Sequence, residues 1–154
     1  MSLCFEDLHV GQVFRAGPHT IGLEAMQRFA AVNDPQYFHV DPEAATASLF
    51  GGLIGSGWQT AALTMSMLIA AARFSGGVVG AGADIEWRTP TRPGDSIEIE
   101  AEILELWPSR SQPDRGFAVL RIETRNQRGE TIQIMRAKAM IFRRGSALAA
   151  AGPG

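Results

Sequence analysis

The sequence predicts an α+β fold in which a curved antiparallel β-sheet wraps around one long apolar helix. Residues 44–72 contain no charged side chain, and the helix expected near their end is apolar on every side, so protein must surround it. The second half of the chain changes to a two-residue alternation of apolar and polar side chains, the pattern of strands with one buried face. The apolar face of the sheet and the apolar helix each need a partner, and packing them together satisfies both.

Each expected element follows from a local pattern. Leu23, Met26, Phe29 and Ala30 recur at helical spacing. Asp41 and Pro42 form an N-cap and first helical residue, which begin a short helix. The expected helices cover residues 22–32, a short segment from residue 42, and residues 58–74, and the expected strands cover residues 12–14, 79–88, 96–104, 117–125 and 131–143.

The alternation slips in two of these strands. One slip falls between Ile103 and Leu104 and the other between Ile134 and Met135. A slip of one residue turns the following side chains to the opposite face, unless an extra residue bulges out of the ladder. We therefore expect a β-bulge or bend at each place, in a curved meander.

Composition indicates one ordinary globular domain, which we place at residues 1–144, before a flexible tail over residues 145–154. The net charge of −2 argues against a nucleic-acid surface, which is normally basic. Cys4 is the single cysteine, so disulfides within the chain and cysteine-rich metal sites are excluded. These features fit a cytoplasmic protein that does not bind nucleic acid.

Two features bear on membranes and secretion. The first twenty residues contain Glu6, Asp7 and Arg15 and no continuous apolar run, so we expect no secretory signal. Glycines interrupt the uncharged stretch up to Gly57, and the remaining run over residues 58–72 is shorter than the roughly 20 residues a membrane span needs. We therefore expect no membrane association.

The segment DPQYFH places Asp34 and His39 close together, in what we expect to be a non-helical turn after the first helix because it contains Pro35. Such a pair can hold a water, one group taking its proton and the other delivering a proton to substrate. Alternatively, His39 packs the turn and Asp34 binds backbone amides. A metal site that also used Asp41 and Glu43 is disfavoured, because Asp41 serves as a cap and no second histidine is near.

The glycine-rich loop GGLIGSG precedes the central helix. At a helix N-terminus, the N–H of Gly57 can point at an anion or a developing oxyanion. Close packing of the loop against the helix is the alternative, and the spacing matches neither a Walker motif nor a dinucleotide-binding motif. Ser56 lacks the surroundings of a hydrolase nucleophile.

The stretch FAAVNDPQYFHVDPEAATASLFGGLIGSGWQTAAL resembles the signature of the MaoC-like dehydratases and R-specific enoyl-CoA hydratases. That signature is Asp-x-Asn-Pro-x-His-x-Asp, followed by a glycine-containing loop and a central helix. RTPTRPGDSIEIEAEIL is similar to the family's strand, Pro-Gly-Asp turn and strand, and the resemblance covers roughly residues 6–143. It implies a hot-dog fold and a homodimer or larger homo-oligomer. It also implies an acyl-CoA or related acyl-thioester substrate, with no further cofactor.

By position, the resemblance carries catalytic roles to three residues. Asp34 and His39 match the catalytic pair, and Gly57 matches the glycine whose N–H polarises the thioester carbonyl. Asp41 matches the second aspartate of the signature, which we still interpret as a helix cap.

The chain departs from the family pattern in two places. Gln36 and Tyr37 stand where the family has Asn-Pro, and Met65 stands where many hydratases place a serine that supports the catalytic pair. We expect substrate contacts from the residues around the pair and the glycine, namely Gln36, Tyr37, Ser56 and Trp58.

The expected reaction is the reversible addition of water to a 2-enoyl-CoA, giving a 3-hydroxyacyl-CoA. An acyl-CoA thioesterase on the same fold is an alternative, because an activated water could attack C1 instead of C3. A non-catalytic protein that binds acyl thioesters is another, since the two departures could have removed catalysis.

Overall fold

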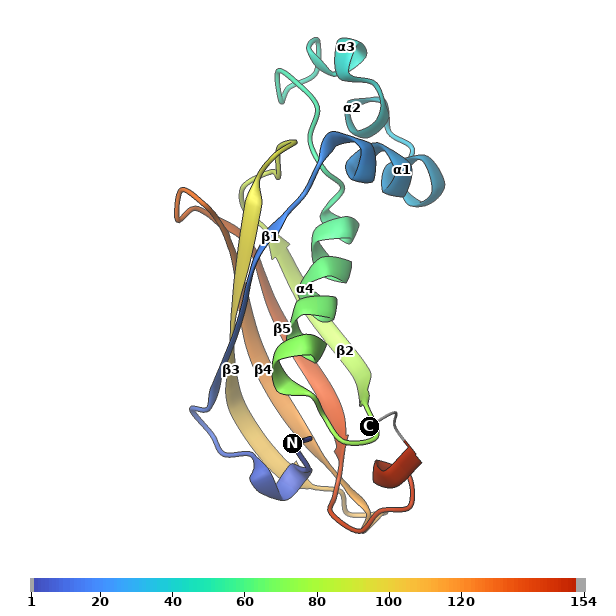
Figure 1. Ribbon diagram of the computed structural model, residues 1–154, viewed down its shortest axis with the longest axis vertical. Coiled ribbons are helices and arrows are strands. Elements are labelled where there is room, and N and C mark those ends of the chain that lie inside the picture. The colour runs from blue at the N-terminus through green and yellow to red at the C-terminus, as the bar shows by residue number, and fades with distance from the viewer. Residues whose placement is uncertain (1, 152–154) are drawn as a thin grey trace.

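The computed structural model describes residues 2–151, in which five antiparallel strands form one sheet that curves around a central helix (Figure 1). The strands are β1 (Val13–Thr20), β2 (Val78–Trp87), β3 (Ser96–Pro108), β4 (Arg115–Asn126) and β5 (Thr131–Phe142), in the spatial order β1-β3-β4-β5-β2. The central helix is α4 (Gly57–Ala72). The predicted α+β architecture is confirmed.

Three helices lie beyond one end of the sheet, next to the N-terminus of α4 (Figure 1). They are α1 (Leu23–Asn33), α2 (Tyr37–Val40) and α3 (Pro42–Ala45). Asp41 caps α3 as predicted, accepting hydrogen bonds from the N–H groups of Glu43 and Ala44. The expectation of a wholly non-helical turn from residue 34 to residue 39 is wrong, because Pro35 interrupts the helical path only up to Gln36, and one helical turn then carries His39.

The inner face of the sheet supplies most of the core. Along β3, Ile97, Ile99, Ala101 and Ile103 are buried and alternate with glutamates on the other face. Burying a side chain the size of isoleucine contributes about 1.5–3 kcal/mol relative to leaving it in water. The repeated burial along neighbouring strands therefore holds the sheet against α4.

One predicted bulge is confirmed and the other is displaced. The pairing of β3 with β4 shifts between Ile103 and Glu105, as the first slip predicts. In β5 the irregularity lies near Ile132, while the pairing at Ile134 and Met135 is regular. The reason is Gln133, which turns inward and is fully buried because it hydrogen-bonds to other buried groups.

The prediction that β2 buries one face, and that α4 is enclosed on every side, is wrong for a single chain. β2 lies at the edge of the sheet and pairs only with β5, so most of its residues are exposed. Along α4, Trp58, Met65 and Ile69 are exposed on one side of the helix. An exposed apolar stripe therefore lies next to a free strand edge.

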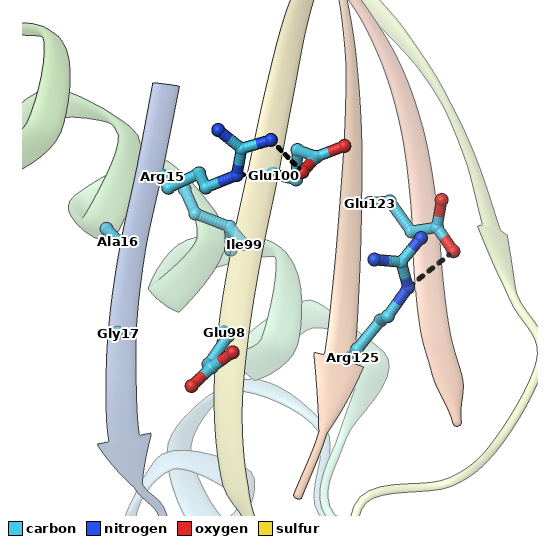
Figure 2. Close-up of a pocket in the computed structure, with 8 residues that line it drawn as sticks. All are labelled: Arg15, Ala16, Gly17, Glu98, Ile99, Glu100, Glu123 and Arg125. Atoms are coloured by element: carbon cyan, nitrogen blue, oxygen red, sulfur yellow. Dashed lines mark hydrogen bonds and ion pairs between the residues drawn. The ribbon is translucent and has the colours of Figure 1, made fainter. Parts of the chain in front are cut away.

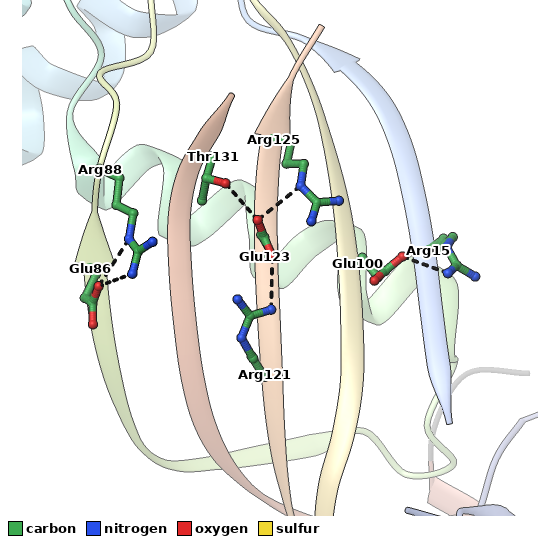
Figure 3. Close-up of polar contacts among 8 residues, drawn as sticks. All are labelled: Arg15, Glu86, Arg88, Glu100, Arg121, Glu123, Arg125 and Thr131. Atoms are coloured by element: carbon green, nitrogen blue, oxygen red, sulfur yellow. Dashed lines mark hydrogen bonds and ion pairs between the residues drawn. The ribbon is translucent and has the colours of Figure 1, made fainter. Parts of the chain in front are cut away.

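The outer face of the sheet carries ion pairs, and α4 lies behind it in Figure 3. Glu123 is central: Thr131 hydrogen-bonds to it, and Arg121 and Arg125 pair with it. The hydrogen bond from Thr131 lowers the pKa of Glu123 and burial raises it. With the two arginines also lowering it, the pKa of Glu123 lies below its usual value.

Figure 2 shows a shallow hollow on this outer face, with a volume of about 260 Å³. Among the residues that line the hollow, Arg15 pairs with Glu100 and Arg125 pairs with Glu123. Because these charges neutralise each other in solvent, we assign the hollow to the surface ion-pair network.

At the other end of the chain, the predicted tail falls partly outside the described residues, at residues 152–154. Within the described part, η2 (Ala149–Ala151) follows Ser146, and the carbonyl of Ala149 accepts a hydrogen bond from Ser75. No helix in residues 2–151 is both long enough and apolar enough to cross a bilayer.

Candidate active site

Asp34 ends α1 and brings its carboxylate to three polar side chains. Ser56 Oγ donates a hydrogen bond of 2.7 Å to Oδ2, and Gln36 Nε2 donates one of 2.8 Å to Oδ1. Nε2 of His39 lies 3.2 Å from Oδ2. Only 17% of the Asp34 side-chain surface is exposed, so these groups fix the direction of the carboxylate.

The environment of Asp34 favours its ionised form. Burial raises the pKa of this carboxyl group, but hydrogen bonds from Ser56 and Gln36 and the charge of His39 outweigh burial. The pKa of Asp34 therefore lies below its usual range, and the group is a carboxylate at neutral pH. As an anion it can accept hydrogen bonds and stabilise a positive imidazolium.

His39 is buried in α2, and one ring nitrogen is already committed. Nδ1 lies 2.8 Å from the carbonyl oxygen of Ile54. A carbonyl oxygen can only accept, so Nδ1 carries a proton and donates it. Nε2 is therefore the ring nitrogen left to face Asp34.

Ser56 and Gly57 join this pair to the start of α4. The buried Ser56 hydroxyl accepts from the N–H of Trp58 at 3.2 Å, which caps the helix, while donating to Asp34. Gly57 is the first residue of α4, and within residues 2–151 its N–H has no hydrogen-bond acceptor. This N–H is available to a ligand, and the helix dipole favours a negative charge there.

The close approach of Trp87 requires glycine at position 57. A Cβ atom there would lie 2.5 Å from the indole ring of Trp87. The indole is itself held in place, because its Nε1 donates a 2.9 Å hydrogen bond to the buried Gln133. A larger residue at position 57 would displace this ring.

A cavity of about 280 Å³ adjoins these groups. His39 and Gly57 both line it. Asp34 is not a lining residue, but its carboxylate contacts His39, which is. The rest of the wall is largely apolar and comes from Phe38, Phe50, Ile54, Gly55, Thr60, Trp87, Arg88, Thr89, Pro90, Thr91 and Ile132. The site can therefore hold an apolar group beside the Asp34–His39 pair and the N–H of Gly57.

The four expected substrate contacts fall into two groups. Gln36 and Ser56 hydrogen-bond to the Asp34 carboxylate. Tyr37 and Trp58 are 51% and 57% exposed and lie outside the cavity lining, where each ring packs edge-on against a neighbouring aromatic ring. The first two thus contact the Asp34 carboxylate, and substrate contact by any of the four stays a prediction.

Met65 does not take part in the site. It is partly exposed and lines a different apolar groove, of about 310 Å³, between α4 and strands β2 and β5. The support that the family's serine would give to the pair comes instead from Ser56, which lies one residue before Gly57 in the sequence.

Sequence reasoning missed the aromatic wall of the cavity. Phe38 and Phe50 come from the segment around α2 and α3, and Trp87 comes from the end of β2. Phe38 and Phe50 also pack against each other, with ring centroids 5.3 Å apart. A usable signal for Trp87 was its place at the end of the alternating strand, separated only by Arg88 from the TPTRPGD turn.

Among solved structures, the chain is similar to hot-dog dehydratases and hydratases. The crystal structure of a MaoC-like dehydratase from Rhodospirillum rubrum has a TM-score of 0.88 and 46% sequence identity, covering 93% of this chain and 99% of that one. The R-hydratase PhaJ1 from Pseudomonas aeruginosa has a TM-score of 0.76 and 25% identity, covering 93% of this chain and 88% of that one. The fold is therefore the hot-dog fold.

Sequence comparison identifies the family. The model of the MaoC-like domain matches residues 7–115. The uncharacterized protein YdeM of Bacillus subtilis is 32% identical over 126 residues, covering 80% of this chain and 87% of that protein. A 3-hydroxybutyryl-CoA dehydratase of Methylorubrum extorquens is 30% identical over 109 residues, covering 70% and 68%. The chain belongs to the MaoC-like domain family.

Proposed function

We propose that this protein is a hydratase/dehydratase of acyl thioesters, which reversibly adds water to a 2-enoyl-CoA to give a 3-hydroxyacyl-CoA. One observation carries the proposal. His39, which contacts Asp34, lines the same cavity as Gly57, and the N–H of Gly57 at the start of α4 has no acceptor within residues 2–151. The named activities of the Methylorubrum dehydratase and the Pseudomonas R-hydratase support the same reaction class.

The proposed reaction divides between the pair and the glycine. As the oxygen of a water bonds to C3, one proton of that water passes to the Asp34–His39 pair. The π electrons of the C2=C3 bond move into C1–C2, and the carbonyl π electrons move onto the thioester oxygen. The pair then returns a proton to C2 as the carbonyl re-forms, so the net change is the addition of one water.

Gly57 would stabilise the negative charge that develops on the thioester oxygen. Its N–H would donate to the thioester oxygen, and a donor at such a position typically contributes about 3–4 kcal/mol of transition-state stabilisation. The N-terminal dipole of α4 favours the same charge. Asp34, His39 and Gly57 supply proton transfer and charge stabilisation, so the proposed reaction uses the CoA thioester as substrate and no further cofactor.

We also propose that the protein acts as a homodimer or larger homo-oligomer in the cytoplasm. The support is the exposed apolar side of α4, with Met65 and Ile69, next to the unpaired edge of β2. Both features are costly in water, and a second copy of the chain can cover them together.

The test is a panel of 2-enoyl-CoAs of increasing chain length, followed by the loss of enoyl absorbance. Wild type is expected to hydrate at least one of them, whereas Asp34→Asn, assayed beside it, is not. Release of free CoA thiol from saturated acyl-CoAs would favour a thioesterase instead. Tight binding without turnover, unchanged in Asp34→Asn, would favour a binding protein.

A further inference from the structure

Thr60 stands out among the residues that line the cavity. It lies on α4 one helical turn after Gly57, and only 2% of its surface is exposed. Both residues line the same cavity. Its side chain is thus a buried polar group within a mostly apolar wall.

The Thr60 hydroxyl has no hydrogen-bond partner within residues 2–151. In the same residues, every side-chain nitrogen or oxygen that is sealed from solvent does have a partner. The Thr60 oxygen is therefore not sealed, and the space open to it is the cavity that the residue lines. Thr64, one turn further along α4, differs: its hydroxyl bonds to Thr124 at 2.8 Å and accepts from Gln133 at 3.2 Å.

Helix geometry directs the Thr60 side chain toward Gly57. Residues three apart lie on the same face of a helix, and each Cα–Cβ bond tilts toward the helix N-terminus. The hydroxyl is thus carried toward the first turn of α4, where the Gly57 N–H and the helix dipole already favour a negative charge. Two donors from one helix face are brought to the same end of the cavity.

We propose that Thr60 is a catalytic residue whose hydroxyl donates a hydrogen bond to the thioester oxygen, beside the Gly57 N–H. This inference rests on the proposed hydratase function. A carbonyl oxygen has two lone pairs, so it can accept from both donors at once. Both bonds strengthen as the oxygen becomes an enolate oxyanion, and the hydroxyl keeps its proton throughout.

Valine and serine substitutions separate the hydroxyl from the shape of the side chain. Thr60→Val removes the hydroxyl at nearly constant volume, and we expect kcat to fall by about 10²-fold, the usual effect of losing one oxyanion donor. KM is expected to change much less, because the bond is strongest in the transition state. Thr60→Ser keeps a hydroxyl and is expected to retain kcat within a few-fold.

A spectroscopic measurement distinguishes carbonyl polarisation from packing. Cinnamoyl-CoA absorbs at longer wavelength when its carbonyl is polarised, and Asp34→Asn is expected to bind it without turnover. Adding Thr60→Val to Asp34→Asn is expected to shrink this red shift, while adding Thr60→Ser preserves it. A residue that only packed the wall would leave the shift unchanged.

The outcomes separate this inference from the function on which it rests. Failure of wild type to hydrate any enoyl-CoA would overturn the proposed function itself. If wild type is active, two results together would overturn the role of Thr60 alone. These are a Thr60→Val kcat equal to that of wild type, and an undiminished red shift when Thr60→Val is added to Asp34→Asn. Should Thr60→Val fail to fold, Thr60→Ala compared with Thr60→Ser provides the same contrast.

Discussion

The sheet interior and the N-terminal end of α4 are built on different principles. Along β3 from Ile97 to Ile103, buried apolar side chains recur every second residue, and each contributes through apolar contact. At the end of α4, three segments each contribute one polar group: Asp34 after α1, His39 within α2 and Ser56 before α4. The interior thus rests on many equivalent contacts, and the site depends on a few particular hydrogen bonds.

This difference implies that stability and catalysis can be changed separately. Losing one buried isoleucine weakens the whole domain but leaves the polar groups at α4 in their relative positions. Losing one polar group at α4 changes proton transfer but removes little buried apolar surface.

Substitution of either member of the pair is expected to have the largest effect. Asp34→Asn and His39→Gln should each lower the hydration rate by about 10² to 10⁴-fold, the usual contribution of acid–base catalysis. Neither substitution removes much buried apolar surface, so the thermal unfolding midpoint should change little. Wild-type turnover in either variant, measured by enoyl absorbance, would contradict the assignment.

Ile103→Ala should show the reverse pattern. Ile103 is fully buried on β3 and is not among the residues that line the cavity beside His39 and Gly57. Its truncation should reduce the free energy of unfolding by about 2–5 kcal/mol, and Ile103→Val by about 0.5–1.5 kcal/mol. Urea unfolding measures both, and kcat per folded molecule should remain that of wild type. A fall in kcat matching the loss of stability would show that core and site are coupled.

Ser56 contributes both to stability and to the site, because it caps α4 and donates to Asp34. Ser56→Ala should cost about 1 kcal/mol of stability through the lost cap, whereas Ser56→Gly should cost only a few tenths. Both variants remove a donor that lowers the pKa of Asp34, so this pKa should rise. The acid limb of the kcat/KM profile should then move to higher pH in both, and an unmoved limb in Ser56→Gly would remove Ser56 from the site.

The lowered pKa of Asp34 also predicts a dependence of stability on pH. The folded pKa lies below the reference value of 3.8, so the unfolded chain binds a proton first as the pH falls. The stabilisation is fully present above pH 3.8 and is lost as the pH drops through the folded pKa. Denaturant unfolding between pH 5 and roughly 2 should show wild type losing more stability than Asp34→Asn.

The smallest effect is expected on the outer face of the sheet. Arg15→Gln breaks the pair with Glu100, in which both side chains are substantially exposed. Exposed pairs contribute about 0–1 kcal/mol and weaken with salt. Urea unfolding at low and high salt should therefore show a small difference that shrinks as salt is added. A loss above about 2 kcal/mol would show that this face contributes far more than surface pairs usually do.

Periodicity was enough to predict the sheet, the central helix and the cap at Asp41, because these depend on residues close in sequence. It failed where tertiary contacts reversed the local preference. Gln133, a polar residue, lies in the core next to the equally buried Ile132, because the Trp87 indole and the Thr64 hydroxyl satisfy its amide. β2 was expected to bury one face, but its position at the sheet edge is not encoded in its own residues.

The candidate site shows the same division. Motif spacing was enough to place Asp34 and His39 together and Gly57 at a helix N-terminus. The bond from Ser56 to Asp34 spans 22 positions, and the bond from His39 to the Ile54 carbonyl spans 15. The aromatic wall likewise joins Phe38 of α2 with Trp87 at the end of β2, and α3 and α4 lie between them in the sequence. No local pattern in the sequence specifies such contacts.

The central claim is that the Asp34–His39 pair delivers water to C3 of a 2-enoyl thioester. It is tested most directly by incubating wild type and Asp34→Asn with crotonyl-CoA in water labelled with ¹⁸O and locating the label by mass spectrometry. One ¹⁸O is expected at C3 of 3-hydroxybutyryl-CoA with wild type, and almost none with Asp34→Asn. Label in the carboxylate of a released acid, or equal labelling by both proteins, would contradict it.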